Sequence, residues 1–170
     1  IWWAGNTYKI MKGDPVPDKK GRIVIQSARN EGEGFQVVLQ PNETLENISI
    51  TITDFKQKSG SVISAANVAI RRVEYVNVTK PSGLLHEAGL YPDPLPLLEK
   101  SFNAEKGVNS PVWFTVKVPK KAVPGTYNAI IFIKSDNWEA FVPVELEVWD
   151  FVLPDIPYMR SAFGLYSGMI

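Results

Sequence analysis

The chain contains no cysteine, a single histidine and no excess of charge of either sign. Without cysteine, disulfides, thiolate zinc sites and cysteine nucleophiles are excluded. His86 has no second histidine to complete a metal site, and Asp14, Asp18 and Asp54 lack the spacing of a calcium loop, so we expect no metal and no cofactor. Lys plus Arg equals Asp plus Glu at 18 each, so nucleic acid is not an expected partner.

Long apolar runs are also missing, as is any convincing amphipathic helix. No segment predicts a membrane-spanning helix, and the chain opens on Ile1-Trp2-Trp3 without a basic region, so we expect that any signal peptide has been removed. The sequence shows no Ser-His-acid triad and no phosphate-binding glycine loop. We therefore expect no catalytic residue within this chain.

An alternation of period two is the pattern that the sequence does contain. Ile48, Ile50 and Ile52 alternate with polar residues, and turn-forming residues bound each apolar segment. Strands are predicted at 22–28, 35–40, 48–53, 68–79, 113–118, 126–134 and 140–151. About eight strands predict an all-β fold, an antiparallel β-sandwich of immunoglobulin-like or jelly-roll-like type, with an up-and-down barrel as the alternative.

Two turns and one long irregular segment are predicted between these strands. Residues 135–137 read as a hairpin turn, and 122–125 as a turn that leads into the strand containing Tyr127. From about 81 to 108, prolines and glycines replace the alternation. Irregular segments of that length in a compact domain are usually functional or interfacial when they carry apolar residues to bury.

Within this irregular segment, Tyr91, Asp93 and Leu95 are candidates for an interdomain contact or the edge of a ligand site. Pro92 and Pro94 fix the backbone on either side of the Asp93 carboxylate, which orders it at low entropic cost. The alternative is structural: Asp93 closes a turn while the two larger side chains pack on the core. We favour the structural alternative.

The segment 28–36 joins two predicted strands and carries Arg29, Glu31 and Glu33. Two carboxylates so close in sequence could act as an acid and base pair. They lie in a short turn punctuated by glycine, where solvation is expected. We therefore favour a structural turn with one Arg and Glu ion pair.

The five tryptophans divide into two groups. Trp113 and Trp149 lie in apolar strands, and we expect them in the core because such rings bury large areas. Trp138 follows the predicted hairpin turn and could be exposed. With Trp2 and Trp3 it forms the set of candidates for stacking against sugars.

The C-terminal part predicts a boundary. Residues 1–152 are expected to form the sandwich domain. Residues 153–160 are expected to form a linker that begins with the rigid connector Leu153-Pro154-Asp155-Ile156-Pro157. The apolar segment 161–166 is an expected strand, and an unpaired apolar strand is an aggregation hazard. We expect 161–170 to begin a further domain, and Phe163 to contribute to the contact between the domains.

Several short motifs occur together in one order and spacing. They are Ala28 to Gln36, Gly89 to Leu95, Pro111-Val112-Trp113, Val118-Pro119, Gly125-Thr126-Tyr127 and Phe151-Val152-Leu153-Pro154. In this order they resemble the N-terminal β-sandwich domain of bacterial glycoside-hydrolase-like proteins related to family 123, the β-N-acetylgalactosaminidase family. The resemblance runs from about Trp3 to Gly164.

The resemblance implies a downstream (β/α)8-type barrel that holds the active site, with a paired Asp and Glu assisting the sugar's own acetamido group. Those residues would lie beyond this chain. We therefore expect a non-catalytic accessory domain that packs against the barrel of a periplasmic or extracellular glycoside hydrolase acting on N-acetylhexosamine-containing glycans. The alternative is a carbohydrate-binding module that uses exposed aromatic rings, with glycans as its partner.

Overall fold

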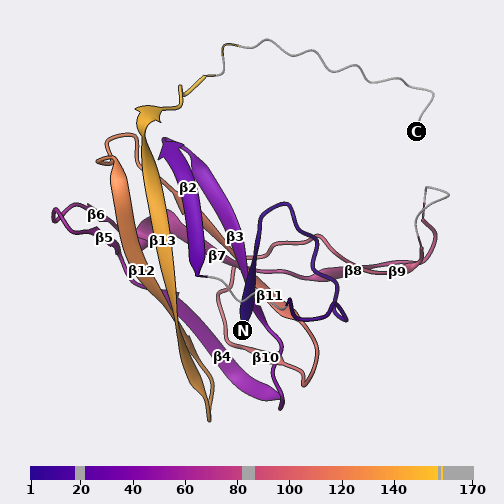
Figure 1. Ribbon diagram of the computed structural model, residues 1–170. Helices are drawn as coiled ribbons and strands as arrows, with labels where there is room; N and C mark the ends of the chain where they lie inside the picture. Colours follow the sequence, from indigo (N-terminus) through magenta and orange to yellow (C-terminus); the bar gives the residue numbers. More distant parts are fainter. Residues whose placement is uncertain (18–21, 82–86, 157, 159–170) are drawn as a thin grey trace, which may run out of the picture.

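The computed structural model describes residues 1–17, 22–81, 87–156 and 158, and strands dominate them (Figure 1). The all-β prediction is confirmed. The strands are β1 (Trp2–Gly5), β2 (Ile23–Arg29), β3 (Gly32–Leu39), β4 (Leu45–Ile52), β5 (Phe55–Gln57), β6 (Val62–Ile63), β7 (Val68–Arg72), β8 (Tyr75–Val78), β9 (Gly89–Pro92), β10 (Phe102–Ala104), β11 (Ser110–Lys117), β12 (Gly125–Lys134) and β13 (Glu139–Val152). A 3-10 turn, η1 (Ala65–Asn67), precedes β7.

Two sheets form the sandwich. The smaller is antiparallel with the order β1-β3-β11-β7, and the larger has the order β10-β4-β12-β13-β2, with β5 and β6 attached to β12. One pairing departs from the antiparallel expectation, because β13 runs parallel to β2, with Val144 opposite Ile23. The β2–β3 turn carries the chain from one sheet to the other, so β2 and β3 are not a hairpin within one sheet.

The core lies between the inner faces of the two sheets. Along β12 every second residue is buried, as the alternation of strand side chains requires. Phe35 and Phe114 stack at its centre with ring centroids 5.0 Å apart and planes 9° from parallel. Full burial of one such side chain stabilises the fold by roughly 1.5–3 kcal/mol.

The turn that leads into β12 is built around Gly125 and Tyr127. Gly125 has a φ of +123°, and a Cβ there would collide with the side chain of Gln57, whose Nε2 donates to the Pro124 carbonyl at 2.9 Å. The buried Tyr127 hydroxyl donates to the carbonyl of Val123 at 2.7 Å, an arrangement like the tyrosine corner of immunoglobulin-type sandwiches. Burial raises the pKa of Tyr127. The predicted turn at 122–125 is confirmed.

The predicted strand 68–79 and the irregular segment after it are organised differently from expectation. The strand divides into β7, within the smaller sheet, and β8, which pairs with β9 in a separate hairpin projecting from the sandwich (Figure 1). At the division the Glu74 amide donates to the Pro94 carbonyl, and the Glu74 carbonyl accepts from the Asp93 amide. The segment at 81–108 thus contains β9 and β10, because backbone pairing requires no alternating side chains.

Candidate functional site

The best-organised polar site is the β2–β3 turn, at the end of the sandwich where β13 leaves it. Asn30 lies in the left-handed region with a φ of 68°, a conformation that asparagine tolerates better than most residues. Its amide donates to the Val118 carbonyl at 3.0 Å, and its carbonyl accepts from Lys117 Nζ at 2.8 Å. These bonds join the turn to the β11–β12 connection.

Glu31 holds the same turn from inside. One oxygen of its carboxylate accepts from the Ala28 amide at 2.7 Å and, at 3.4 Å, from the Ser27 hydroxyl. Both residues are buried, at 1% and 0% exposure, and an unpaired buried amide costs about 1–3 kcal/mol. Glu31 is therefore committed to the backbone and is not free to act as an acid or base.

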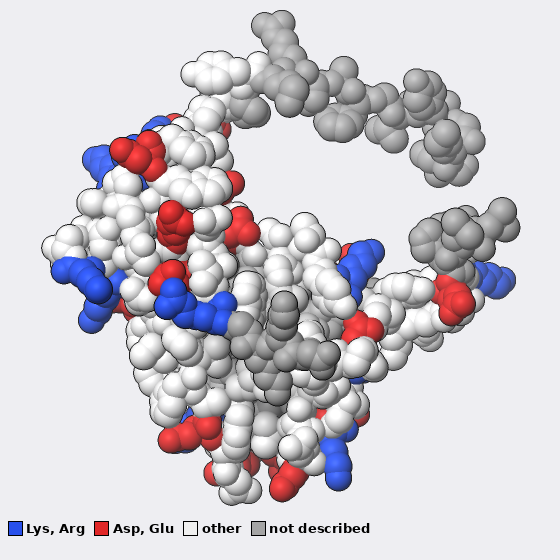
Figure 2. All heavy atoms as spheres, in the orientation of Figure 1, with Lys and Arg blue, Asp and Glu red and all other residues white. Residues whose placement is uncertain are grey.

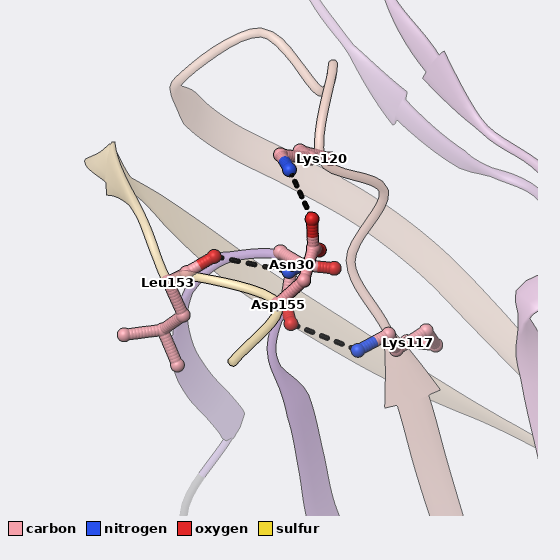
Figure 3. Close-up of polar contacts among 5 residues, drawn as sticks. All are labelled: Asn30, Lys117, Lys120, Leu153 and Asp155. Atoms are coloured by element: carbon pink, nitrogen blue, oxygen red, sulfur yellow. Dashed lines mark hydrogen bonds and ion pairs between the residues drawn. The ribbon is translucent and has the colours of Figure 1, made fainter. Parts of the chain in front are cut away.

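The chain that follows β13 is attached to this turn (Figure 3). The Leu153 amide donates to the Arg29 carbonyl at 2.9 Å, which adds one bond beyond the strand. Asn30 Nδ2 donates to the Leu153 carbonyl at 3.0 Å and to Asp155 Oδ1 at 2.9 Å. Lys120 Nζ lies 2.6 Å from the other Asp155 oxygen. We call this group, Asn30, Lys117, Lys120, Leu153 and Asp155, the exit clamp.

The electrostatics of the clamp favour an ionised Asp155. The hydrogen bond from Lys120, followed by that from Asn30, holds the pKa of the Asp155 carboxyl below its ordinary value of 3.8. Asp155 is exposed, so solvent screens the ion pair with Lys120, and such pairs contribute little to global stability. The clamp therefore attaches Leu153 and Asp155 to the β2–β3 turn and the β11–β12 connection.

An exposed aromatic pair lies beside the exit clamp, on the last residues of β13. Trp149 and Phe151 stack with centroids 5.7 Å apart, and they are 39% and 48% exposed. The prediction that Trp149 belongs to the core is wrong, because Val144, Leu146 and Val148 face inward and its position in the alternation puts it outside. Trp113 is also not in the buried core: it is partly exposed over Gly34.

The opposite end of the sandwich carries a groove of about 480 Å³. One wall is the β3–β4 loop, and the other is the β12–β13 turn, where the Ser135 amide donates to the Trp138 carbonyl at 2.8 Å. This geometry confirms the predicted hairpin at 135–137. Trp138 lines the groove and is 36% exposed. The groove lacks the converging charged contacts of the exit clamp.

The chain can now be placed by comparison. The sequence-family model of the glycoside hydrolase 123 N-terminal domain matches residues 6–135 of the chain. The chain belongs to this family. A family 123 glycoside hydrolase from Clostridium perfringens, whose structure was solved to analyse its hydrolysis of glycolipid glycans, shares the fold. The match has a TM-score of 0.64 and 24% sequence identity. That match covers 77% of this chain but 23% of the enzyme. The chain thus spans less than a quarter of that relative.

Two further solved structures are more distant. The PapD-like domain 7 of human CEP192 matches with a TM-score of 0.38 and 12% identity, over 88% of this chain and 98% of that one. The N-terminal domain of PorA matches with a TM-score of 0.34 and 12% identity, over 83% and 96%. Neither value supports an argument about topology or function. No curated protein sequence matches the chain.

In this family 123 N-terminal domain, the predicted interdomain residues lie on the projecting β8–β9 hairpin and on the segment that follows it. The Tyr91 hydroxyl donates to the Glu87 carbonyl at 2.8 Å, Asp93 is exposed, and Leu95 is 37% exposed. No hydrogen bond from a described residue reaches the Asp93 carboxylate, so the favoured structural interpretation, in which Asp93 closes a turn while Tyr91 and Leu95 pack on the core, has no side-chain bond among the described residues to support it and stays a prediction. The interdomain role stays a prediction. Phe163 lies outside the described residues.

The predicted stacking tryptophans do not share one surface. Trp2 is 4% exposed and packs with Ile10 and Val38, so it offers no platform. No local pattern predicts that β1 pairs with β3. Trp3 packs partly against the main core. Trp138 alone of the three lines the groove at the hairpin turn.

The predicted ion pair of the β2–β3 turn has a different partner. Arg29 Nη2 lies 3.1 Å from Asp150 Oδ1, not from a glutamate of the turn. Glu33 accepts from Asn6 Nδ2 at 3.3 Å. Burial, and after it the Glu31 charge, raises the pKa of Glu33. The two carboxylates therefore have different hydrogen-bond partners, while the charge of Glu31 still acts on Glu33.

Most of the exit clamp is not visible in local sequence patterns. Those patterns marked the segment 28–36 and the rigid connector but not the contact between them, and they did not identify Lys117, Lys120 or Asp155 as partners of Asn30. The available signal was an acidic residue in a proline-flanked connector together with lysines next to a turn.

In the described part of the chain, no three His, Cys, Asp or Glu side chains are grouped to hold a metal, and no helix could span a bilayer. Figure 2 shows acidic and basic side chains intermixed on the face of the molecule that it draws.

Proposed function

We propose that this family 123 N-terminal domain is a non-catalytic accessory domain. It holds the C-terminal catalytic barrel of a glycoside hydrolase that acts on N-acetylhexosamine-containing glycans. The exit clamp carries the proposal, because Asn30 bonds both Leu153 and Asp155. A connector bonded at two points leaves the sandwich in one direction, which fixes where the next domain starts. Export to the periplasm or cell exterior stays a prediction.

The aromatic pair supports the same role. Trp149 and Phe151 expose a stacked apolar surface next to the point of exit. Contiguous exposed apolar surface of this kind marks contact sites. A domain that begins at the end of the clamped connector is the nearest partner that could cover it. We therefore place the contact between the two domains at this end of β13.

The experiment uses a double variant of the full-length protein that carries both Trp149→Ala and Phe151→Ala. This variant is compared with the wild type. We expect the two domains to lose their common unfolding transition in calorimetry and kcat/KM for an aryl N-acetylgalactosaminide to fall. The matched control is Phe132→Ala with Phe141→Ala, since that exposed pair lies on the same sheet near the groove, with centroids 5.3 Å apart.

Two results would contradict the proposal. Equal effects of the two double variants would remove the reason to place the contact beside the clamp. Hydrolysis of the same substrate by the 170-residue chain alone would show that the domain is itself catalytic.

A further inference from the structure

The groove at the end opposite the exit clamp has the size and composition of a small-ligand site. Its volume of about 480 Å³ lies within the range of about 300–1,000 Å³ usual for ligand pockets. Leu45 and Trp138 contribute apolar surface to its lining. Ligand sites combine such surface with a few polar groups that fix orientation.

The frame of the groove is held by hydrogen bonds on both walls. On the loop side, the Pro41 carbonyl accepts from the Gly107 amide at 2.8 Å. On the turn side, Asp136 Oδ2 accepts from Asn47 Nδ2 at 2.8 Å, and the Ser135 hydroxyl donates to the Trp138 carbonyl at 3.1 Å. A frame of this kind positions the tryptophan before a ligand arrives, which lowers the entropic cost of binding.

Three polar side chains on this frame remain available. Asn42, Glu43 and Asn137 line the groove, are exposed, and form no hydrogen bond to another described residue. An amide offers two donors and an acceptor, and a carboxylate offers acceptors alone. Together they can bond a hydroxyl group that acts as a hydrogen-bond donor or as an acceptor. Groups of this type, around an aromatic ring, are suited to a polyhydroxylated ligand.

The charge of the groove further restricts the class of ligand that can bind. Glu43, Glu46 and Asp136 contribute three carboxylates, and no Lys or Arg is among the lining residues. An anionic sugar would be repelled here, whereas a neutral one would not. The face of a pyranose presents C–H groups that fit the electron-rich face of an indole ring.

We propose that this groove binds a short neutral oligosaccharide, with a pyranose ring stacked on Trp138 and its hydroxyl groups bonded by Asn42, Glu43 and Asn137. The site goes beyond the accessory role proposed above and does not depend on it. It lies at the far ends of β12 and β13 from the exit clamp, so it can hold a glycan while the opposite end contacts the barrel.

The test is a calorimetric titration of the 170-residue chain with a neutral N-acetylhexosamine trisaccharide, paired with amide chemical-shift mapping. We expect saturable binding, with shifts confined to 40–46 and 135–138. Trp138→Ala is expected to weaken binding at least tenfold, in line with the loss of a central aromatic contact. Trp149→Ala is the matched control, because its ring is similarly exposed at the other end, and it should bind as the wild type does.

Asn137→Ala provides a second variant in case Trp138→Ala perturbs the fold, which a thermal melt would report. We expect it to weaken binding several-fold with an unchanged melting temperature. Absence of saturable binding in the wild type, equal losses in Trp138→Ala and Trp149→Ala, or tighter binding of a sialylated trisaccharide would each overturn the proposal. Failure here leaves the calorimetric test of domain contact unaffected, so the two ideas can fail separately.

Discussion

The two ends of the sandwich are built from the same kind of element, turns between strands, yet they differ in what their polar groups do. At the exit end, Asn30, Glu31 and Asp155 are committed to other parts of the chain. At the groove end, Asn42 and Asn137 are exposed and unbonded among the described residues. The exit end uses these groups to fix the chain, whereas the groove end leaves Asn42 and Asn137 available to a ligand.

The largest expected effect comes from removing the internal bond of the exit turn. Glu31→Ala leaves the buried Ala28 amide without its acceptor, and we expect a loss of about 2 kcal/mol in the free energy of unfolding. Urea denaturation followed by tryptophan fluorescence measures it. Glu43→Ala, in the loop at the groove, is the control and should change stability by less than about 0.5 kcal/mol. Equal losses would erase the difference between the ends.

A smaller effect is expected at the tyrosine of the neighbouring turn. Tyr127→Phe keeps the buried ring but deletes the bond to the Val123 carbonyl, and we expect a loss of about 1–1.5 kcal/mol. The same urea assay applies. Tyr8, which is 54% exposed, supplies the control: Tyr8→Phe should leave the unfolding midpoint where it was, and a shift as large as that of Tyr127→Phe would contradict the argument.

The clamp can be separated from the backbone of its turn with glycine. Asn30→Gly accommodates the φ of 68° but removes the side chain that holds Leu153 and Asp155. We expect global stability to change by less than about 1 kcal/mol, while proteolytic cleavage near 153–158 becomes several-fold faster. Asn47→Gly, whose φ is 54° near the groove end, should not alter cleavage there. Unchanged cleavage in Asn30→Gly would refute the clamp.

The smallest effect is a dependence on pH. The pKa of Asp155 is lower when the segment is anchored, so the contribution of its charge is present above the ordinary value of 3.8 and is lost as the pH falls through the anchored pKa. Chemical shifts of the Asn30 side-chain amide should follow that loss. In Asp155→Asn the same shifts should not titrate. An identical titration in that variant would assign the change to another group.

Local patterns predicted the parts of the fold that depend on neighbouring residues. Turn residues located the 122–125 turn and the 135–137 hairpin, and alternation located most strands. The Trp149 prediction failed because it weighed the hydrophobicity of the strand and not the alternation with Val148, which was already visible in the sequence. The parallel pairing of β13 with β2 carries no local pattern, so no reading of either strand alone could predict it.

The amino-acid sequence by itself determined that this protein is a β-sandwich and which of its motifs resemble family 123. Those features follow from side-chain alternation, turn chemistry and motif order, each of which acts over a few residues. Only the tertiary structure brought Asn30 to Asp155, 125 residues away, and the β3–β4 loop to Trp138. The physical reason is that such contacts depend on which strands pair and where two sheets meet, and those choices are made by the packing of the whole core.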